Sequence, residues 1–275
     1  MTVGPPATQR LPQDVIEAVA ERLRREPRLG FDRRSPRLAL EDGTLEVDGE
    51  VPALSIKRRA IRAAASVPGI IWVVDRLRVQ PSEHMGDAAI REHVVDGLLG
   101  EPALAECALR KIVKGQIEEV RVPVQQHGDV CVAVDDGVVT LDGDLPSRAH
   151  KRLAGVLSWW VPGTRDVVDG LGVLSPEQDN DEEVSDAVRM ALEKDPFVDA
   201  SQTRVRTVDG VVQLTGLVVN DSQREMAEED AWYVLGVTDV INAIDVQKRA
   251  SAAARRPRSR TTEARALAPR RALSR

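Results

Sequence analysis

Few side chains in the sequence are of the types that perform nucleophilic or metal chemistry. They are His84, His93, His127, His150, Cys107 and Cys131. A structural zinc site needs four ligands, typically in closely spaced pairs, and this set lacks such spacing. No histidine lies in a His-Glu-x-x-His pattern, and two cysteines are too few for a disulfide scaffold. We therefore expect neither a metal site nor a cofactor.

The glycines do not form a phosphate-binding loop. The GxxxxGK[ST] pattern does not occur, and Lys114-Gly115 stands alone. Gly170-Leu171-Gly172 falls in a predicted strand, without the third glycine and the helix start of a dinucleotide-binding loop. No Ser-His-Asp order is evident either. The sequence therefore predicts that the protein is not an enzyme.

Aromatic residues make up only 3% of the chain, yet four of them form two adjacent pairs. Trp159-Trp160 and Trp232-Tyr233 lie 73 residues apart, each at the end of a predicted helix. Large rings dominate buried area, so one ring of each pair is expected to close a core. Helix neighbours point about 100° apart, which leaves the other ring for a membrane interface or a partner. These four residues and Trp72 are the candidate lipid- or partner-binding residues.

A basic segment ends the chain. Residues 248–275 contain ten basic residues and one acid, Glu263, so they carry a net charge of +9 and the remainder carries −15. The segment has almost no large apolar residues, and we expect it to be disordered. It is either a solvated extension or a tether for an anionic phospholipid surface or nucleic acid. Its candidate contact residues are Arg255, Arg256, Arg258 and Arg260.

The chain repeats itself three times. One segment reads DGTLEVDGEV from Asp42, DGVVTLDGDL from Asp136 and DGVVQLTGLV from Asp209. A second segment follows each of these after 25 residues, as VPGIIWVV, VPGTRDVV and VLGVTDVI. Asp-Gly is typical of a tight hairpin turn, and the later glycine ends the regular pairing or allows a bulge. The predicted turn residues are Asp42, Gly43, Gly49, Asp136, Gly137, Gly143, Asp209, Gly210 and Gly216.

An amphipathic stretch precedes each Asp-Gly segment and predicts a helix. Apolar residues at i, i+4 and i+8 form a stripe that packs on a core. The stripes begin at Val15, Ile90 and Val184, after acids that suit a helix N-terminus as caps and by charge: Asp14, Asp87 and Asp181.

The order within a repeat is then helix, strand, strand, helix, strand. First strands are predicted at 37–41, 129–134 and 203–208, second helices at 56–65, 148–160 and 223–234, and last strands at 72–79, 166–173 and 239–246. We predict an α+β fold of three tandem α-β-β-α-β modules. Each is expected to be a three-stranded mixed sheet with two helices on one face.

The domain boundaries follow from this order. We expect a flexible N-terminus at 1–10, modules at 11–80, 81–174 and 175–248, and the basic tail at 249–275. The second module holds about 21 extra residues, at about 105–128. There we expect a short helix at 103–113 and a strand at 120–124. This insertion either forms a surface that binds a partner or is an extension with no binding role.

The helix, the D-G-x-V-x-L-x-G hairpin, the second helix and the VxGVxxVxxxlxV strand together resemble the BON domain, a small bacterial module. The resemblance covers about residues 11–248 in three copies, and the third copy is the closest. It implies an α-β-β-α-β fold and non-enzymatic roles in envelope integrity, osmotic stress and binding to phospholipid surfaces. Some cytoplasmic members are connected with potassium sensing. The resemblance supplies no catalytic motif.

The sequence also bounds location and partners. No apolar run approaches the roughly 20 residues that cross a bilayer, and the first residues lack the regions of a secretory signal. We expect a cytoplasmic protein, peripheral to a membrane. The predicted function is non-enzymatic binding or scaffolding, at an anionic phospholipid surface or with another protein of the envelope or osmotic-stress response. The alternatives are a small-ligand or potassium-like cation sensor and nucleic-acid tethering through the tail.

Overall fold

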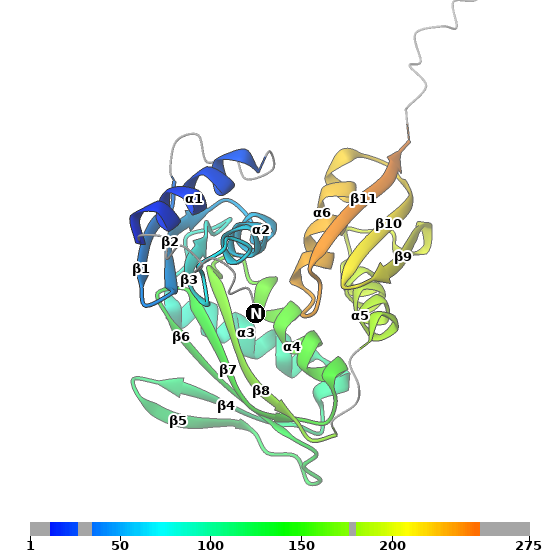
Figure 1. The fold of residues 1–275 in the computed structure, drawn as a ribbon. Helices are drawn as coiled ribbons and strands as arrows, with labels where there is room; N and C mark the ends of the chain where they lie inside the picture. Colours follow the sequence, from blue (N-terminus) through cyan, green and yellow to red (C-terminus); the bar gives the residue numbers. More distant parts are fainter. Residues whose placement is uncertain (1–11, 27–34, 176–179, 248–275) are drawn as a thin grey trace, which may run out of the picture.

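The computed structural model describes residues 12–26, 35–175 and 180–247. Within them the chain forms three α+β modules, as predicted (Figure 1). The first and third modules lie side by side above the helices of the second. The arginine-rich segment 248–275, with Arg255, Arg256, Arg258 and Arg260, lies outside the described residues.

The first and third modules have the predicted element order, and the second has it apart from the insertion. The first contains α1 (Pro12–Arg25), β1 (Arg37–Glu41), β2 (Thr44–Val51), α2 (Leu54–Ala65) and β3 (Trp72–Val79). The second contains α3 (Asp87–Gly100), η1 (Pro102–Leu104), β4 (Ala108–Val113), β5 (Gln116–Arg121), β6 (Asp129–Asp135), β7 (Val138–Leu145), α4 (Arg148–Trp159) and β8 (Asp166–Val173). The third contains α5 (Asp181–Lys194), η2 (Ala200–Gln202), β9 (Thr203–Val208), β10 (Val211–Val218), α6 (Asp221–Tyr233) and β11 (Asp239–Val246).

The sheets are mixed, and the strand after the Asp-Gly turn is central in the first and third modules. The orders are β1-β2-β3 and β11-β10-β9, with an antiparallel hairpin and a parallel last strand. The apolar stripes of α1, α3 and α5 are buried against these sheets, as their spacing predicted. In the first module, for example, Val15 and Val19 of α1 share a core with Leu45 and Val47 of β2. Burial of such stripes is the main favourable contribution to folding.

The middle sheet differs from the prediction, because it has five strands in the order β5-β4-β6-β7-β8. The predicted helix at 103–113 is wrong: only η1 is helical, and β4 pairs in parallel with β6. The predicted strand at 120–124 is displaced, since β5 ends at Arg121. The pair Lys114-Gly115 makes the turn between them, with φ of 50° and 78°. Two consecutive positive φ angles are what a two-residue hairpin turn requires.

In the second and third modules, the Asp-Gly turn is held by the first residue of the preceding helix. The carboxylate of Asp181 accepts hydrogen bonds from the N–H groups of Asp209 and Gly210, at 2.7 and 2.9 Å. Asp87 does the same for the second module's turn. The expected capping role of these acids is therefore wrong, since the N-cap of α5 is Asn180. Charge-assisted bonds to two backbone donors are strong, and each ties a helix to its own hairpin.

The later glycine of each repeat lies where two strands pass closely. Gly143 and Gly216 have φ of 127° and 141°, in a region that side chains disfavour. A Cβ at Gly143 would overlap the carbonyl oxygen of Asp129, and one at Gly216 would overlap that of Gln202. Glycine is therefore needed there for the hairpin to close.

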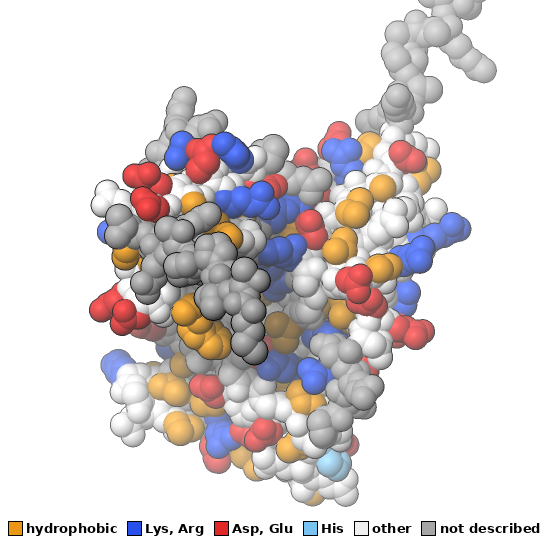
Figure 2. Space-filling model, viewed as in Figure 1, with side chains coloured by type: hydrophobic (Ala, Val, Ile, Leu, Met, Phe, Trp, Pro, Cys, Tyr) orange, Lys and Arg blue, Asp and Glu red, His pale blue; other side chains and the backbone are white. Residues whose placement is uncertain are grey.

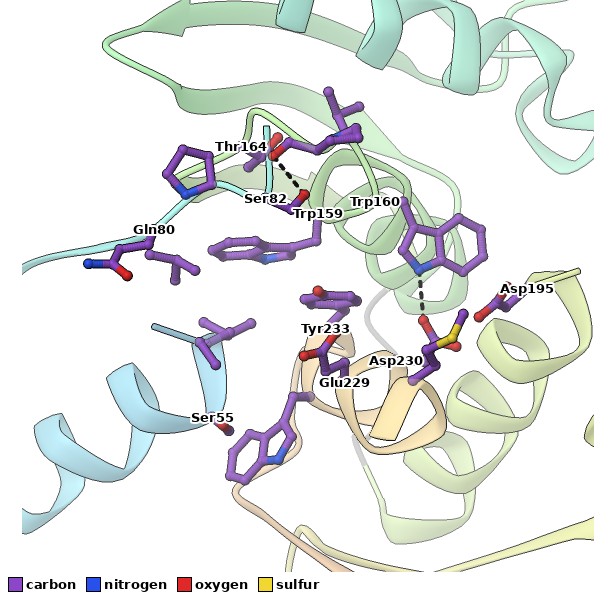
Figure 3. Close-up of a pocket in the computed structure, with 18 of the residues that line it drawn as sticks. Ser55, Gln80, Ser82, Trp159, Trp160, Thr164, Asp195, Glu229, Asp230 and Tyr233 are labelled. Carbon is purple, nitrogen blue, oxygen red and sulfur yellow. Dashed lines mark hydrogen bonds between the residues drawn. The ribbon is translucent and has the colours of Figure 1, made fainter. Parts of the chain in front are cut away.

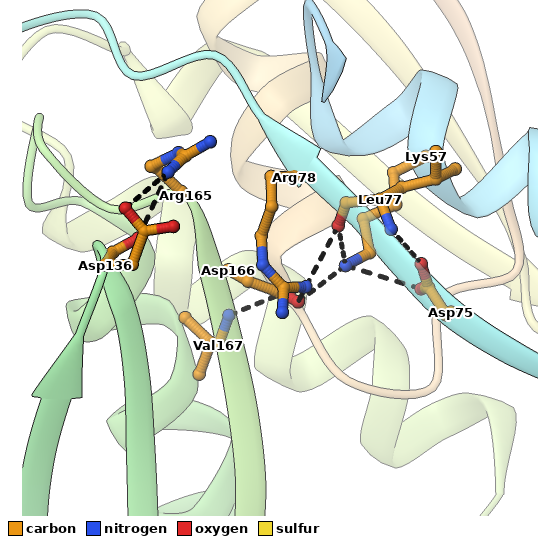
Figure 4. A network of polar contacts seen from close by, with 8 residues as sticks. All are labelled: Lys57, Asp75, Leu77, Arg78, Asp136, Arg165, Asp166 and Val167. Carbon is orange, nitrogen blue, oxygen red and sulfur yellow. Dashed lines mark hydrogen bonds and ion pairs between the residues drawn. The ribbon is translucent and has the colours of Figure 1, made fainter. Parts of the chain in front are cut away.

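A buried polar network joins the first and second modules (Figure 4). The ammonium group of Lys57, on α2, donates to the carboxylate of Asp166 at 2.7 Å and to the carbonyl of Leu77 at 2.7 Å. Arg78 also pairs with Asp166 at 2.7 Å. Lys57 and Asp166 are 5% and 8% exposed, and Asp75 is a second partner of Lys57 at 3.4 Å. Removal of Lys57 or Asp166 would leave the buried network with an unbalanced charge, which is destabilising.

The third module contacts both of the others. Arg152 of the second module donates to the carbonyl of Leu235 at 2.9 Å, and the contacts with the first module are made by α2. Arg59 of α2 pairs with Asp239 at 3.0 Å, and Arg58 donates to the carbonyls of Val234 and Val237 at 3.1 Å. Burial lowers the pKa of Arg58 to about 10, and the positive charge of Arg62 adds to this effect. Figure 2 shows basic side chains in the hollow between the first and third modules, where α2 faces α6.

Candidate functional site

A pocket of about 420 Å³ opens where the three modules meet (Figure 3). The first module supplies residues 52–55 and 79–82, the second 159–162 and Thr164, and the third 195–197 together with the inner side of α6. No single module contains this site, so its shape depends on how the modules pack.

Four of the five predicted aromatic residues line this one pocket. Trp159 ends α4 and Tyr233 ends α6, and their rings stack across the module boundary with centroids 5.8 Å apart and planes 7° apart. Offset stacking of this kind is a favourable arrangement of aromatic rings. The equivalent ends of two repeated helices therefore meet face to face.

The other ring of each pair closes a core. Trp232 is 1% exposed, and the guanidinium of Arg59 lies 4.8 Å from its ring centroid. Trp160 packs against the third module's core although it belongs to the second module, and its indole N–H donates to Asp230 at 2.8 Å. The sequence predicted one core ring per pair, but it could not show that the remaining rings stack on each other.

Trp72 does not join the other aromatic residues. Its side chain is 70% exposed at the start of β3, and the neighbouring Ile71 is 69% exposed. This pair lies at the Asp42-Gly43 turn, where Ile71 N–H donates to the carbonyl of Gly43 at 2.7 Å. It is a separate surface feature of the first module.

Three acids form an acidic wall beside the aromatic rings of the pocket. It consists of Asp195, Glu229 and Asp230, which sequence reasoning did not single out. Asp230 is 3% exposed; its Oδ1 accepts from Trp160, while its Oδ2 has no hydrogen-bond partner among the described residues. Burial raises the pKa of Asp230 to about 8, and repulsion from Asp195 and Glu229 adds to the shift. The same wall contributes to the raised pKa of the Tyr233 hydroxyl, whose main cause is burial.

The remaining reactive side chains lie apart from the pocket. Cys107 is buried and Cys131 half-buried, and burial raises the pKa of both thiols, which disfavours the nucleophilic thiolate. His127 pairs with Glu106 at 2.7 Å. Within 12–26, 35–175 and 180–247, no histidine, cysteine and acid side chains gather in a group that could hold a metal ion.

Comparison with known proteins decides the family. The BON domain pattern matches residues 13–81, 108–175 and 180–248. The chain belongs to the BON domain family. BON domains are non-catalytic modules, and no enzyme family is indicated. The second match begins at the first residue of β4, after α3.

The chain is also similar to the osmotically-inducible protein Y of Escherichia coli K12. The two are 33% identical over 120 residues, which are 42% of this chain and 60% of that protein. The match thus spans less than two thirds of that relative's length.

Two solved structures of CdsD, a structural protein of the type III secretion system of Chlamydia trachomatis, also match. The C-terminal domain has a TM-score of 0.23 at 14% identity, over 86% of this chain and 98% of that one. The second structure has a TM-score of 0.22 at 14% identity, over 85% and 92%. Among the helices that the structure describes in this chain, none is long and apolar enough to cross a bilayer.

The buried acid predicts how stability depends on pH. The pKa of Asp230 is raised from 3.8 to about 8 in the folded chain, so the folded state holds a proton that the unfolded state loses above about pH 4. Stability is then largest at low pH and falls as the pH rises towards 8. Asp230→Asn keeps an acceptor for Trp160 and should be more stable than the parent at pH 8.5, by several kcal/mol, the order of magnitude that a pKa shift of this size corresponds to.

Urea unfolding at pH 5, 7 and 8.5, followed by tryptophan fluorescence, measures this effect. Asp144→Asn, an exposed acid of the second module, is the control and should follow the parent at every pH. Equal pH dependence in the parent and in Asp230→Asn would contradict the assignment.

Proposed function

We propose that the protein is a non-enzymatic binding protein whose three BON modules hold a ligand pocket at their junction. The observation that carries this proposal is the stacked pair of Trp159 and Tyr233, which brings two modules together at the wall of the pocket. Pockets of roughly 300–1,000 Å³ with aromatic walls and a few polar groups are typical of small-molecule sites. The volume and lining of this pocket fit that description.

The arrangement favours binding over catalysis. The described lining contains no histidine or cysteine, and the hydroxyl groups of Ser82 and Thr164 donate to the backbone carbonyls of Pro162 and Ser158, not to the acids of the pocket. Aromatic rings and buried carboxyl groups instead provide apolar area and a fixed polar end, which are the elements of orientation and selectivity.

A neutral fluorescent probe, N-phenyl-1-naphthylamine, tests the pocket. We expect Trp159→Ala to weaken probe binding about tenfold, because it removes one aromatic wall. Trp72→Ala removes an equally large ring outside the pocket and should leave the affinity unchanged. Ser55→Phe places a large ring in the pocket from the side of the first module and should abolish binding. If the probe does not bind the parent chain, or binds Trp159→Ala and Ser55→Phe as tightly as the parent, the proposal is wrong.

A second function is favoured by a different observation, the exposed pair Ile71 and Trp72. We propose that this pair and the basic segment 248–275 attach the protein to an anionic phospholipid surface. A tryptophan beside a large aliphatic side chain suits the headgroup region of a bilayer, and basic residues near the surface each add about 1 kcal/mol. The similarity to an osmotically-inducible protein supports a place in the osmotic-stress response.

Co-sedimentation with vesicles measures this attachment. The full chain should bind phosphatidylglycerol vesicles at low salt and not phosphatidylcholine vesicles. Ile71→Ser/Trp72→Ser and a chain ending at Lys248 should each bind at least fivefold less, while Trp159→Ala should bind normally. Binding that is unaffected by both changes, or no binding by the full chain, would overturn the membrane proposal.

The other two predicted functions gain no support from the described residues. A cation sensor needs several converging oxygen ligands, and the described residues contain no group of three or more histidine, cysteine or acidic side chains that could hold a metal ion. Nucleic-acid tethering depends on residues 248–275, which lie outside the described part of the chain.

A further inference from the structure

The buried acids of the described chain differ in whether a basic side chain pairs with them. The described buried carboxylates are Glu101, Asp166 and Asp230, at 7%, 8% and 3% exposed. Glu101 pairs with Lys194 at 2.8 Å, and Asp166 pairs with Lys57 at 2.7 Å. Asp230 is the most buried of the three, yet no cationic side chain pairs with it among the described residues. Without a ligand, Asp230 is held as a neutral acid beside Asp195, and a cationic donor from outside the chain can replace the proton that it holds.

The neighbours of Asp230 add negative charge at this position. Asp195 lies next to it, and the repulsion between the two carboxylates raises the pKa of Asp230 further. Asp195 is half-buried, so one member of the carboxyl pair remains accessible from the pocket. The described lining contains three acids and no lysine, arginine or histidine. An occupant with a positive charge would therefore be attracted, and an anion would be repelled.

The rest of the lining selects the kind of cation. A metal ion needs several oxygen ligands at short distance, and the described residues offer no cluster that could hold one. The lining also includes Trp159, Tyr233 and Leu54, which favour an apolar or aromatic body. Aromatic faces also attract organic cations. A single molecule with a positively charged end and an apolar end would interact favourably with both the acids and the aromatic rings of the pocket.

Resting on the proposed pocket function, we propose that the junction pocket binds a protonated organic amine. Its ammonium group pairs with the carboxylates of Asp195 and Asp230, and its apolar part packs against Trp159 and Tyr233. The ammonium group supplies the donors that the Asp230 carboxyl lacks, and it takes the place of the proton that the carboxyl pair otherwise holds.

Isothermal titration calorimetry with three matched probes tests the proposal on the full chain. The probes are 2-phenylethylamine, 2-phenylethanol and phenylacetate, which share a ring and differ in charge. We expect the amine to bind at least tenfold more tightly than the alcohol, and the acid not to bind. Asp230→Asn keeps the contact with Trp160 and should reduce the amine to the affinity of the alcohol. Asp144→Asn, at an exposed acid outside the pocket, should retain the preference.

The neutral probe N-phenyl-1-naphthylamine distinguishes a failure of the amine proposal from a failure of the pocket function. If that probe binds the parent chain but the amine and the alcohol bind equally, the amine proposal is wrong and the pocket function stands. If neither the neutral probe nor the amine binds, both are wrong. If Asp230→Asn retains the full preference for the amine, the carboxyl pair is not the cation site and the proposal is also wrong.

Discussion

The packing of α2 and α4 against α6 is the constraint on which the rest of the molecule depends. Each module alone is small, and domains of about 65–70 residues bury a limited apolar area. The chain extends that area by sharing helices: α2 lies against α6, and α4 lies against both α5 and α6. Val156 of α4 is buried in the third module's core. The pocket exists because these helices end near one another, with Trp159 and Tyr233 at their last turns.

Buried acids have different surroundings at the interface of the first two modules and at the pocket. Between the first two modules, Lys57 and Arg78 neutralise Asp166, so the interface is closed by paired groups. At the pocket, Oδ1 of Asp230 accepts from Trp160, and no basic side chain among the described residues pairs with this acid. Proteins rarely leave a buried polar group unsatisfied without a reason. The contrast within one chain is why the pocket, and not the Lys57–Asp166 network, is the candidate binding site.

The sequence predicted local structure better than it predicted contacts between modules. The repeated Asp-Gly turns and the i, i+4, i+8 stripes depend on neighbouring residues, and they gave the element order and the last strands. The segment 103–113 was misread as a helix, because its partner is β6, a strand that begins only at Asp129. The acids Asp195 and Asp230 were not identified, because α5 and α6 had to pack before their carboxyl groups met. Nothing in the spacing of Trp159 and Tyr233 shows that they stack.

Differential scanning calorimetry of the full chain tests most directly whether the three modules form one unit with a fixed junction. The account predicts a single unfolding transition whose van't Hoff enthalpy equals the calorimetric enthalpy, since the helices and the Lys57–Asp166 network couple all three modules. Separate transitions, each with the enthalpy of one module, would contradict it, because independent modules could not maintain a shared pocket.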